Sequence, residues 1–177
     1  LQSLVGELGG SHRYFVADLS SAAGQDAVVA ELRSGKYNVL VNNAGVGLVG
    51  SFTDIPVDKC LAMMHLNCDA VVKLSHAFLE QAKSGAALVN VSSTLAFLPM
   101  PGIGVYSATK AFVTSFTETL WFEQKKRGIF VFGLHPGVTA TNFQVNAGGR
   151  MEDLPKGMAQ TPDQVADVVM AALRERK

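Results

Sequence analysis

Short apolar runs alternate with longer segments of helical periodicity along almost the whole chain. Runs rich in β-forming residues, which predict buried strands, cover residues 12–17, 38–41, 86–91 and 129–134. Apolar positions recur at helical spacing in residues 1–8, 24–32, 57–79, 106–124 and 161–173. Because strands alternate with helices, the sequence predicts an α/β fold with a mainly parallel sheet. In such a sheet, ligands bind at the carboxyl ends of the strands.

Signals in the sequence also mark where some helices begin and end. Gly128 after the basic stretch 125–127 is a helix stop signal, and Thr161-Pro162-Asp163-Gln164 has the composition of a cap and first turn. The glycine-containing segment 142–157 predicts a mobile lid over a substrate. On the last helix we expect an inward face made of Val165, Val168, Val169 and Leu173.

The helix predicted for 106–124 carries a phenol and an amine on one face. Tyr106 and Lys110 are four residues apart, which places their Cβ atoms roughly 6 Å apart. A lysine cation at that distance favours the phenolate by about two pKa units, so the pair predicts a proton-transfer group. Taken alone, such a pair is more often an ordinary surface pair. Ser93, at a strand end, supplies a hydroxyl that can hold a substrate oxygen beside the phenol.

Composition and length narrow the class of protein. The chain has 177 residues, of which 48% are hydrophobic and 17% charged, with 15 acidic and 15 basic residues. We expect one compact domain over residues 1–177, and a balanced charge argues against a nucleic-acid binder. No apolar run reaches the ~18 residues of a membrane span, and no signal peptide opens the chain. These features predict a cytoplasmic protein that binds no membrane.

A metal site is not expected. Cys60, His65 and Cys68 form a loose constellation without a fourth ligand nearby, so we interpret the two cysteines as reduced thiols. Gly45, Gly47 and Gly50 spell a dinucleotide fingerprint after a strand, but no helix opens at the third glycine as that fingerprint requires. The next helix is expected to begin near residues 56–58 instead.

Several motifs in one order resemble the short-chain dehydrogenase/reductase family. Ser93, twelve further residues, Tyr106, three more and then Lys110 resemble its active-site signature, and Asn67 matches the asparagine of its Ser-Tyr-Lys-Asn tetrad. Asn42-Asn43-Ala44-Gly45 resembles its strand-end motif. The segment from Pro136 to Thr141 resembles the one that closes over the nicotinamide. The resemblance covers nearly the whole chain and implies a Rossmann-like, doubly wound, three-layer α/β/α fold.

The resemblance implies a role for each matching residue. Tyr106 is the general acid and base, Ser93 orients the substrate oxygen, Lys110 lowers the phenol pKa and binds ribose, and Asn67 bends its helix and holds a proton-relay water. Asn42 to Gly45 is implied to lie beside the adenine ribose and to stabilise the central sheet. The implied cofactor is NAD or NADP, and its contacts are Asp18, Asn43, Ala44, Gly45, Tyr106, Lys110, Pro136, Gly137, Thr139 and Thr141.

Alternatives remain for single residues. Asp18 can instead cap the helix at 24–32. Asn67 can be a solvent-facing residue. Asparagine is, however, a poor helix-interior residue, so a kink is expected at Asn67. The Ser-x-x-Lys sequence from Ser107 to Lys110 matches an acyl-transfer nucleophile motif. Its companion Ser-Asp-Asn and Lys-Thr-Gly elements do not occur in the chain.

As a whole, the resemblance implies an NAD(P)-dependent oxidoreductase that moves hydride between nicotinamide and a small carbonyl or alcohol substrate. It also implies a homodimer or homotetramer, formed through the helices that begin at Asn67 and Tyr106. Phe112, Phe116 and Trp121 are candidates for burial there or in the core. Relative to the family, the first strand with its glycine-rich loop and the last strand fall outside the given sequence. A non-catalytic relative that binds a partner is the alternative function.

Overall fold

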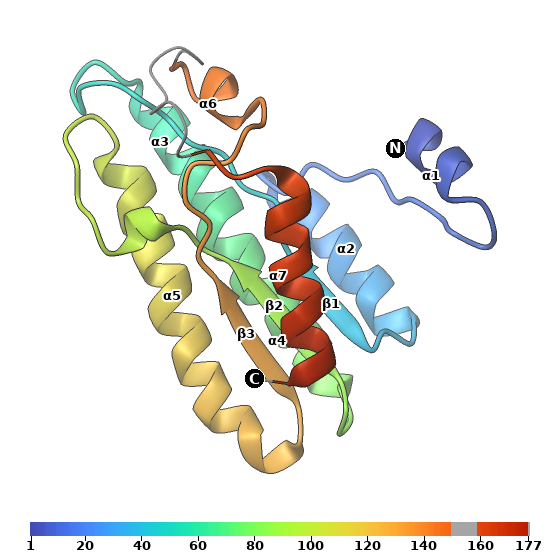
Figure 1. Cartoon of the computed structure of the whole chain (residues 1–177). Coiled ribbons are helices and arrows are strands. Elements are labelled where there is room, and N and C mark those ends of the chain that lie inside the picture. Colours follow the sequence, from blue (N-terminus) through green and yellow to red (C-terminus); the bar gives the residue numbers. More distant parts are fainter. Residues whose placement is uncertain (150–158, 177) are drawn as a thin grey trace.

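The computed structural model describes residues 1–149 and 159–176 and contains a parallel sheet at its centre (Figure 1). In this part of the chain the sheet has three strands in the order β1 (Val39–Asn42), β2 (Ala87–Val91) and β3 (Phe130–Leu134). Val39 pairs with Ala87, and Ala87 with Phe130, which fixes the register. The strands predicted at 38–41, 86–91 and 129–134 are therefore confirmed, each beginning one residue later than expected.

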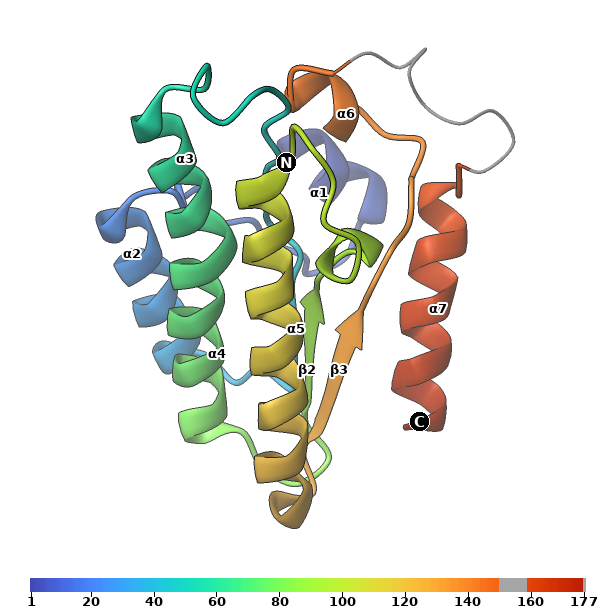
Figure 2. The ribbon, with the colours of Figure 1, turned by 90° about the vertical axis from the view of Figure 1, so that its left-hand side faces the viewer.

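Helices cover both faces of the sheet. Figure 2 shows α2 (Ala22–Ser34), α4 (Ala70–Gln81) and α5 (Gly104–Gln124) on one side and α7 (Pro162–Glu175) on the other. The predicted Rossmann-like α/β/α arrangement is therefore confirmed. The remaining helices are α1 (Gln2–Leu8), α3 (Val57–Met64), the π-helical turn η1 (His65–Asp69), the 3₁₀ turns η2 (Thr94–Ala96) and η3 (Lys125–Arg127), and α6 (Phe143–Asn146).

The main core lies between the sheet and helices α4 and α5. Phe78, Leu88, Leu120 and Val131 are buried together there, and a second cluster of Leu32, Leu74 and Ala77 joins α2 to α4. Burying such apolar surface contributes about 25 cal/mol per Å², so these contacts fix how the helices lie on the sheet. The helices in turn fix the side chains that they carry toward the carboxyl ends of the strands.

The strand predicted for 12–17 is wrong. These residues form no ladder, and Tyr14, Phe15 and Val16 are exposed. A strand exists only through hydrogen bonds to a neighbour, and no other segment of the described chain pairs with this one. Figure 1 shows the segment running from α1 past the sheet toward α2.

Two predictions about the last part of the chain have mixed outcomes. Thr161 and Gln164 form a reciprocal capping box at the start of α7, as predicted. Val168, however, is largely exposed, while Val165, Val169 and Leu173 are half-buried. A helix that meets the sheet along a narrow stripe leaves the flank of its apolar face in water, which explains the exposure of Val168.

Of the lid predicted for 142–157, the first part forms α6, and residues 150–157 lie outside the described residues.

Candidate active site

The three strand ends bring the predicted motifs to one edge of the sheet. Beyond β2 and β3, the amide of Ser92 donates to the carbonyl of Leu134 (2.7 Å) and that of Thr94 to Pro136 (3.0 Å). The pairing thus continues past the strands and holds the Ser93 segment beside the Pro136 segment. β1 ends at Asn42 on the other side of β2, so the parallel topology itself assembles these segments.

Lys110 is buried at the first turns of α5. Its side chain is 5% exposed, its Nζ donates to the carbonyl of Val91 at 2.9 Å, and Nζ lies 5.7 Å from the centre of the Tyr106 ring. Removal from water disfavours the charged form, so burial lowers the Lys110 pKa to about 8, against a smaller opposing effect of Cys68. The predicted Tyr106–Lys110 proximity is therefore present.

The predicted lowering of the Tyr106 pKa is wrong in direction. The phenol is 7% exposed, and burial raises its pKa, while the hydrogen bond with the Ser93 side chain acts in the opposite sense and is the smaller effect. Desolvation dominates because the tyrosine and the lysine are buried together, which favours the neutral form of each. Ser93 is placed beside the phenol as expected, and Phe143 of α6 covers the tyrosine, with ring centres 5.6 Å apart.

Asn67 lies in the π-helical turn η1, between α3 and α4. It is 1% exposed, so the solvent-facing alternative is wrong, and the predicted kink takes the form of this wider turn. Its amide pairs with the main chain of Val46 in both directions (3.0 and 2.9 Å) and donates to the Thr109 hydroxyl at 3.1 Å. These bonds fix the orientation of the amide.

Gly45 is the point where Asn67 and Lys110 converge. A Cβ at this position would lie 3.2 Å from Asn67 Oδ1 and 3.4 Å from Lys110 Nζ. Only a residue without a side chain lets both groups approach the strand-end backbone so closely. This close approach explains why a glycine stands at position 45. The fingerprint that Gly45 shares with Gly47 and Gly50 opens no helix, because α3 begins only at Val57, as predicted.

Asn42 holds the sheet to the helices. Its Nδ2 donates to Ser75 of α4 (3.0 Å) and to Asn90 of β2 (2.8 Å), and Asn90 donates to Thr117 of α5 (2.9 Å). This buried polar chain crosses from one helix through two strands to another. It stabilises the central sheet, as the resemblance implied for this motif, while the neighbouring Asn43 and Ala44 are exposed at the edge.

A second network behind the site includes a histidine that the sequence analysis did not use. His135 Nε2 lies 3.2 Å from the Thr114 hydroxyl, which lies 2.7 Å from Ser92 Oγ; both hydroxyls also bond the carbonyl of Lys110. Burial lowers the His135 pKa. The sequence held one signal for this network: Thr114 follows Lys110 by four residues and therefore lies on the same helix face.

Two of the sequence alternatives are not supported. The Ser107 hydroxyl is buried and has no hydrogen-bond partner among the described residues, so Lys110 does not activate it for acyl transfer. Asp18 does not cap α2; Ser21 does, accepting from the amide of Gly24. The Asp18 carboxylate accepts from the side chain and amide of Ser20, and these bonds lower its pKa. Asp18 stays exposed, with its suggested contact to adenine untested.

The two threonines of the 136–141 segment bond within that segment. The Thr139 hydroxyl donates to the carbonyl of Gly137 (3.2 Å), and the Thr141 hydroxyl accepts from the amide of Phe143 at the start of α6 (3.2 Å). The amide of Ala140 and the carbonyl of Val138 pair with Gln160, which ties the segment to the chain before α7. Each threonine keeps lone pairs available to a ligand.

The described residues contain neither a metal-binding cluster nor a helix long and apolar enough to cross a membrane. His65 pairs with Asp69 at 2.6 Å instead of with the cysteines, and burial raises the pKa of the half-buried Cys68 to about 11. A thiol with so high a pKa is a poor metal ligand. The expectation of reduced cysteines agrees with both being free.

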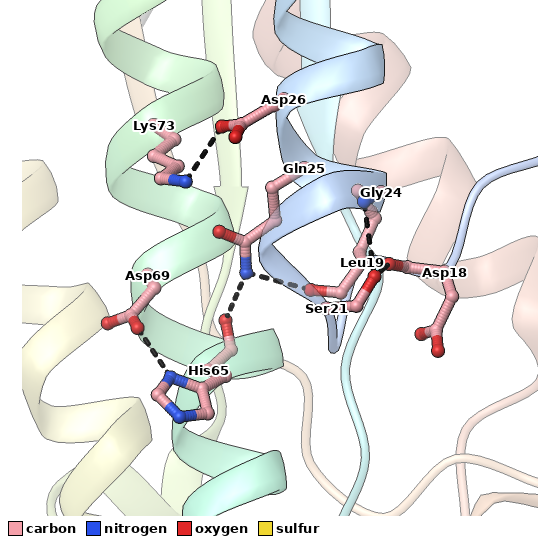
Figure 3. A network of polar contacts seen from close by, with 9 residues as sticks. All are labelled: Asp18, Leu19, Ser21, Gly24, Gln25, Asp26, His65, Asp69 and Lys73. Atoms are coloured by element: carbon pink, nitrogen blue, oxygen red, sulfur yellow. Dashed lines mark hydrogen bonds and ion pairs between the residues drawn. The ribbon is translucent and has the colours of Figure 1, made fainter.

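The sequence analysis also missed Gln25. This glutamine of α2 is 3% exposed, and its amide reaches from α2 to the carbonyl of His65 in η1 (Figure 3). The signal was present in the sequence, because Gln25 occupies the helix stripe whose other members are Val28, Val29 and Leu32. A polar residue in an apolar stripe indicates a buried hydrogen bond.

Comparisons with known proteins agree with this geometry. Residues 1–151 match the family model described as short chain dehydrogenase. A probable oxidoreductase EphD of Mycobacterium tuberculosis is 30% identical, over 96% of this chain and 32% of that protein. Serine 3-dehydrogenase of Agrobacterium fabrum is 29% identical, over 96% of this chain and 72% of that protein.

Solved structures are similar over almost the whole chain. A short-chain dehydrogenase from Sphingobium yanoikuyae in complex with NADPH superposes with a TM-score of 0.89 and 29% identity, over 99% of this chain and 69% of that one. The chain spans about a third of the length of the mycobacterial relatives. The family model covers most of the chain, and the strand-end geometry is consistent with it, so this chain belongs to the short-chain dehydrogenase family.

Proposed function

We propose that this chain carries the catalytic centre of an NAD(P)-dependent oxidoreductase that transfers hydride between a nicotinamide and the carbon of a carbonyl or alcohol. The observation that carries the proposal is the convergence of Ser93, Tyr106, Lys110 and Asn67 at the carboxyl edge of a parallel sheet. Family membership supports it, as do similar structures from Sphingobium yanoikuyae and Burkholderia cenocepacia that contain NADPH and NADP.

In the reduction direction, Tyr106 donates a proton to the carbonyl oxygen while Ser93 holds that oxygen. A phenol whose pKa is raised by burial is neutral at pH 7 and therefore has a proton to give. Lys110, with a pKa of about 8, is mostly cationic at that pH and stabilises the phenolate that remains. Asn67 supports the return of a proton from solvent by holding the relay near Lys110.

The residues around the strand ends fit a nicotinamide dinucleotide, which supplies or accepts the hydride when bound. Asn43 and Ala44 are exposed, and Gly45 carries no side chain beside Lys110 and Asn67, so a flat, polar ligand can approach the strand end closely. The Asp18 carboxylate is an exposed acceptor suited to an adenine amine. On the other side, Pro136, Gly137, Thr139 and Thr141 would hold the dinucleotide, together with Tyr106 and Lys110. NAD and NADP are both compatible with these groups.

The exposed aromatic side chains of α5 support a homo-oligomer. Phe112 and Trp121 are exposed, as is Phe122, whereas Phe116 packs against the core. Exposed aromatic side chains gathered on one helix are typical of protein interfaces. We therefore propose that copies of the protein associate through α5 as a dimer or tetramer.

Substituting Tyr106 tests the proposed reaction. Tyr106→Phe keeps the ring and removes the proton donor, so reduction of aldehydes and ketones by NADH or NADPH should fall by about 10²–10⁴-fold. Nucleotide binding, followed by fluorescence titration, should stay close to that of the unmodified protein. Tyr14→Phe is the matched control, because Tyr14 is exposed and lies in the extended segment before α2. Turnover that is unchanged in Tyr106→Phe would contradict the proposal.

A further inference from the structure

Gln25 has a different environment from the other residues of its helix stripe. Its side chain is 3% exposed and reaches from α2 to η1, whereas Val28, Val29 and Leu32 of the same stripe pack in the apolar cluster between α2 and α4. A buried amide destabilises a protein unless its donors and acceptors are bonded. The contacts that Gln25 makes therefore show what keeps a polar residue in this stripe.

Both donor contacts of the Gln25 amide go to main-chain carbonyls. Nε2 donates to Leu19 at 2.9 Å and to His65 at 3.1 Å (Figure 3). The first carbonyl belongs to the turn just after Asp18. The second belongs to η1, where the same His65 oxygen also accepts the amide of Ala70 across the wider π-helical turn. One side chain thus joins two segments that are far apart in the sequence.

The contact to His65 bears directly on Asn67, two residues later in the same turn. A π-helical turn is rarer than α-helix and persists only where surrounding contacts favour it. If the turn relaxed to α-helix, Asn67 would rotate away from Val46 and Thr109, the groups that now fix its amide. The Gln25 bond reaches the turn from α2, whereas those contacts come from the segment after β1 and from α5.

Other contacts between α2 and α4 do not reach the turn. Lys73 and Asp26 form an exposed ion pair at 2.9 Å, which Figure 3 shows farther along the helices. At the far end of the same interface, the Gln81 amide donates to the carbonyl of Leu32. These contacts hold the two helices together away from η1, so among the described residues Gln25 supplies the side-chain hydrogen bond from α2 to that turn.

We propose that Gln25 is a positioning residue for Asn67, acting by fixing the π-helical turn η1 against the turn that follows Asp18. The proposal rests on the role proposed above for Asn67 in catalysis. It assigns to α2, which contributes no group to the reaction, the task of keeping the Asn67 amide in place.

The first test measures the turn itself. Gln25→Met keeps the length of the side chain and removes its donors, so the amides of residues 69–71 should exchange with solvent at least about tenfold faster. Gln81→Met is the matched control, since it removes the same kind of bond from the same helix interface and should leave exchange in η1 unchanged. Exchange in η1 that is unaltered by Gln25→Met would overturn the proposal.

The second test separates positioning from general loss of stability. In Gln25→Met, kcat should fall about tenfold while KM for the carbonyl substrate changes less than about twofold, because a small misplacement of a catalytic group mainly affects the chemical step. In an Asn67→Ala background, Gln25→Met should lower kcat no further. An equal loss in Gln81→Met, or a full additional loss in the Asn67→Ala background, would contradict the proposal.

The two proposals fail in different ways. Absence of turnover in the unmodified protein with every aldehyde and ketone tried would contradict the oxidoreductase function, whereas the exchange rates of η1 would still decide whether Gln25 holds the turn. Normal turnover in the unmodified protein together with unaltered exchange in Gln25→Met would contradict the positioning role alone.

Discussion

The two sides of helix α5 differ in where their polar and aromatic groups lie. The buried side carries Lys110, Thr114 and Thr117 beside apolar Val113 and Leu120, while the exposed side carries Phe112 and Phe122 beside Glu118 and Thr119, with Phe122 70% exposed. Surface helices normally bury their apolar stripe and expose polar residues. The buried polar groups and the exposed aromatic rings depart from that pattern, and this agrees with the catalytic role proposed for the inner side and the association proposed for the outer side.

The inner side is stable because its polar groups are bonded. Thr114 and Thr117 each donate to the carbonyl four residues earlier, and each also meets a residue of the strand beneath, Ser92 and Asn90 respectively. Helix and sheet are therefore joined by hydrogen bonds as well as by packing. Substitutions on the two sides should have contrasting effects on activity, stability and association.

The largest effect is expected at Lys110, where activity and stability should change in opposite directions. Lys110→Met should lower turnover by at least about 10²-fold, because the phenolate of Tyr106 loses its cation. It should also raise the free energy of unfolding at pH 7 by about 1–3 kcal/mol, because the folded protein no longer buries a charge whose pKa is held near 8.

The pH dependence gives the sign of this effect. Below pH 8 both the folded and the unfolded protein bind the Lys110 proton, so the full cost of burying the charge is present. Between pH 8 and the unperturbed value of 10.5 the unfolded state alone keeps the proton, so stability rises with pH. Denaturant titrations should therefore show the advantage of Lys110→Met shrinking over this range, and an advantage independent of pH would contradict the explanation.

A smaller effect is expected from paired threonines on the two sides of α5. Thr117→Val leaves the buried Nδ2 of Asn90 without this partner and should cost about 1–3 kcal/mol of stability. Thr119 makes the same bond to the carbonyl four residues earlier but is exposed, so Thr119→Val should change stability by less than about 0.5 kcal/mol. Equal losses in urea denaturation would show that the buried network contributes no more than an exposed hydroxyl.

The smallest effect on the folded chain is expected at Phe122. Phe122→Ser removes a ring that is 70% exposed and that makes an aromatic contact, among the described residues, with the adjoining Trp121. Monomer stability should change by less than about 0.5 kcal/mol, whereas self-association measured by light scattering should weaken at least about tenfold. The exposed Phe52, on another part of the surface, is the control. Unchanged association in Phe122→Ser would contradict the proposal that copies associate through the exposed side of α5.

Local pattern was enough to predict most of the fold. The apolar run at 86–91 is buried on both faces, and the run at 129–134 is buried on one face and half-buried on the other, so their composition identifies them as strands of a parallel sheet. The run at 12–17 has similar composition and forms no strand, because a neighbour for pairing is a property of the fold and not of the segment. The exposure of Val168 likewise depends on how closely α7 lies on the sheet.

At the site, sequence spacing predicted which residues meet but not their energetics. Four-residue spacing placed Lys110 beside Tyr106, yet the direction of the phenol pKa depends on burial, which the spacing does not reveal. Asparagine within a helix pattern predicted a kink at Asn67, but not its π-helical form, nor the hydrogen bond that the turn accepts from Gln25, far away in the sequence. The catalytic and cofactor roles stay predictions until the variants are measured, as do the single domain and the cytoplasmic location.

The parallel register of β1, β2 and β3 also has a consequence for how the protein folds. Each strand pairs with the next only after an intervening helical crossover has been laid down, as in Val39 with Ala87 and Ala87 with Phe130. Such long-range pairing is slow, because the chain loses loop entropy before the pairing stabilises it. Asn42, Ser93 and Pro136 lie at the ends of these strands, so their assembly belongs among the late events of folding.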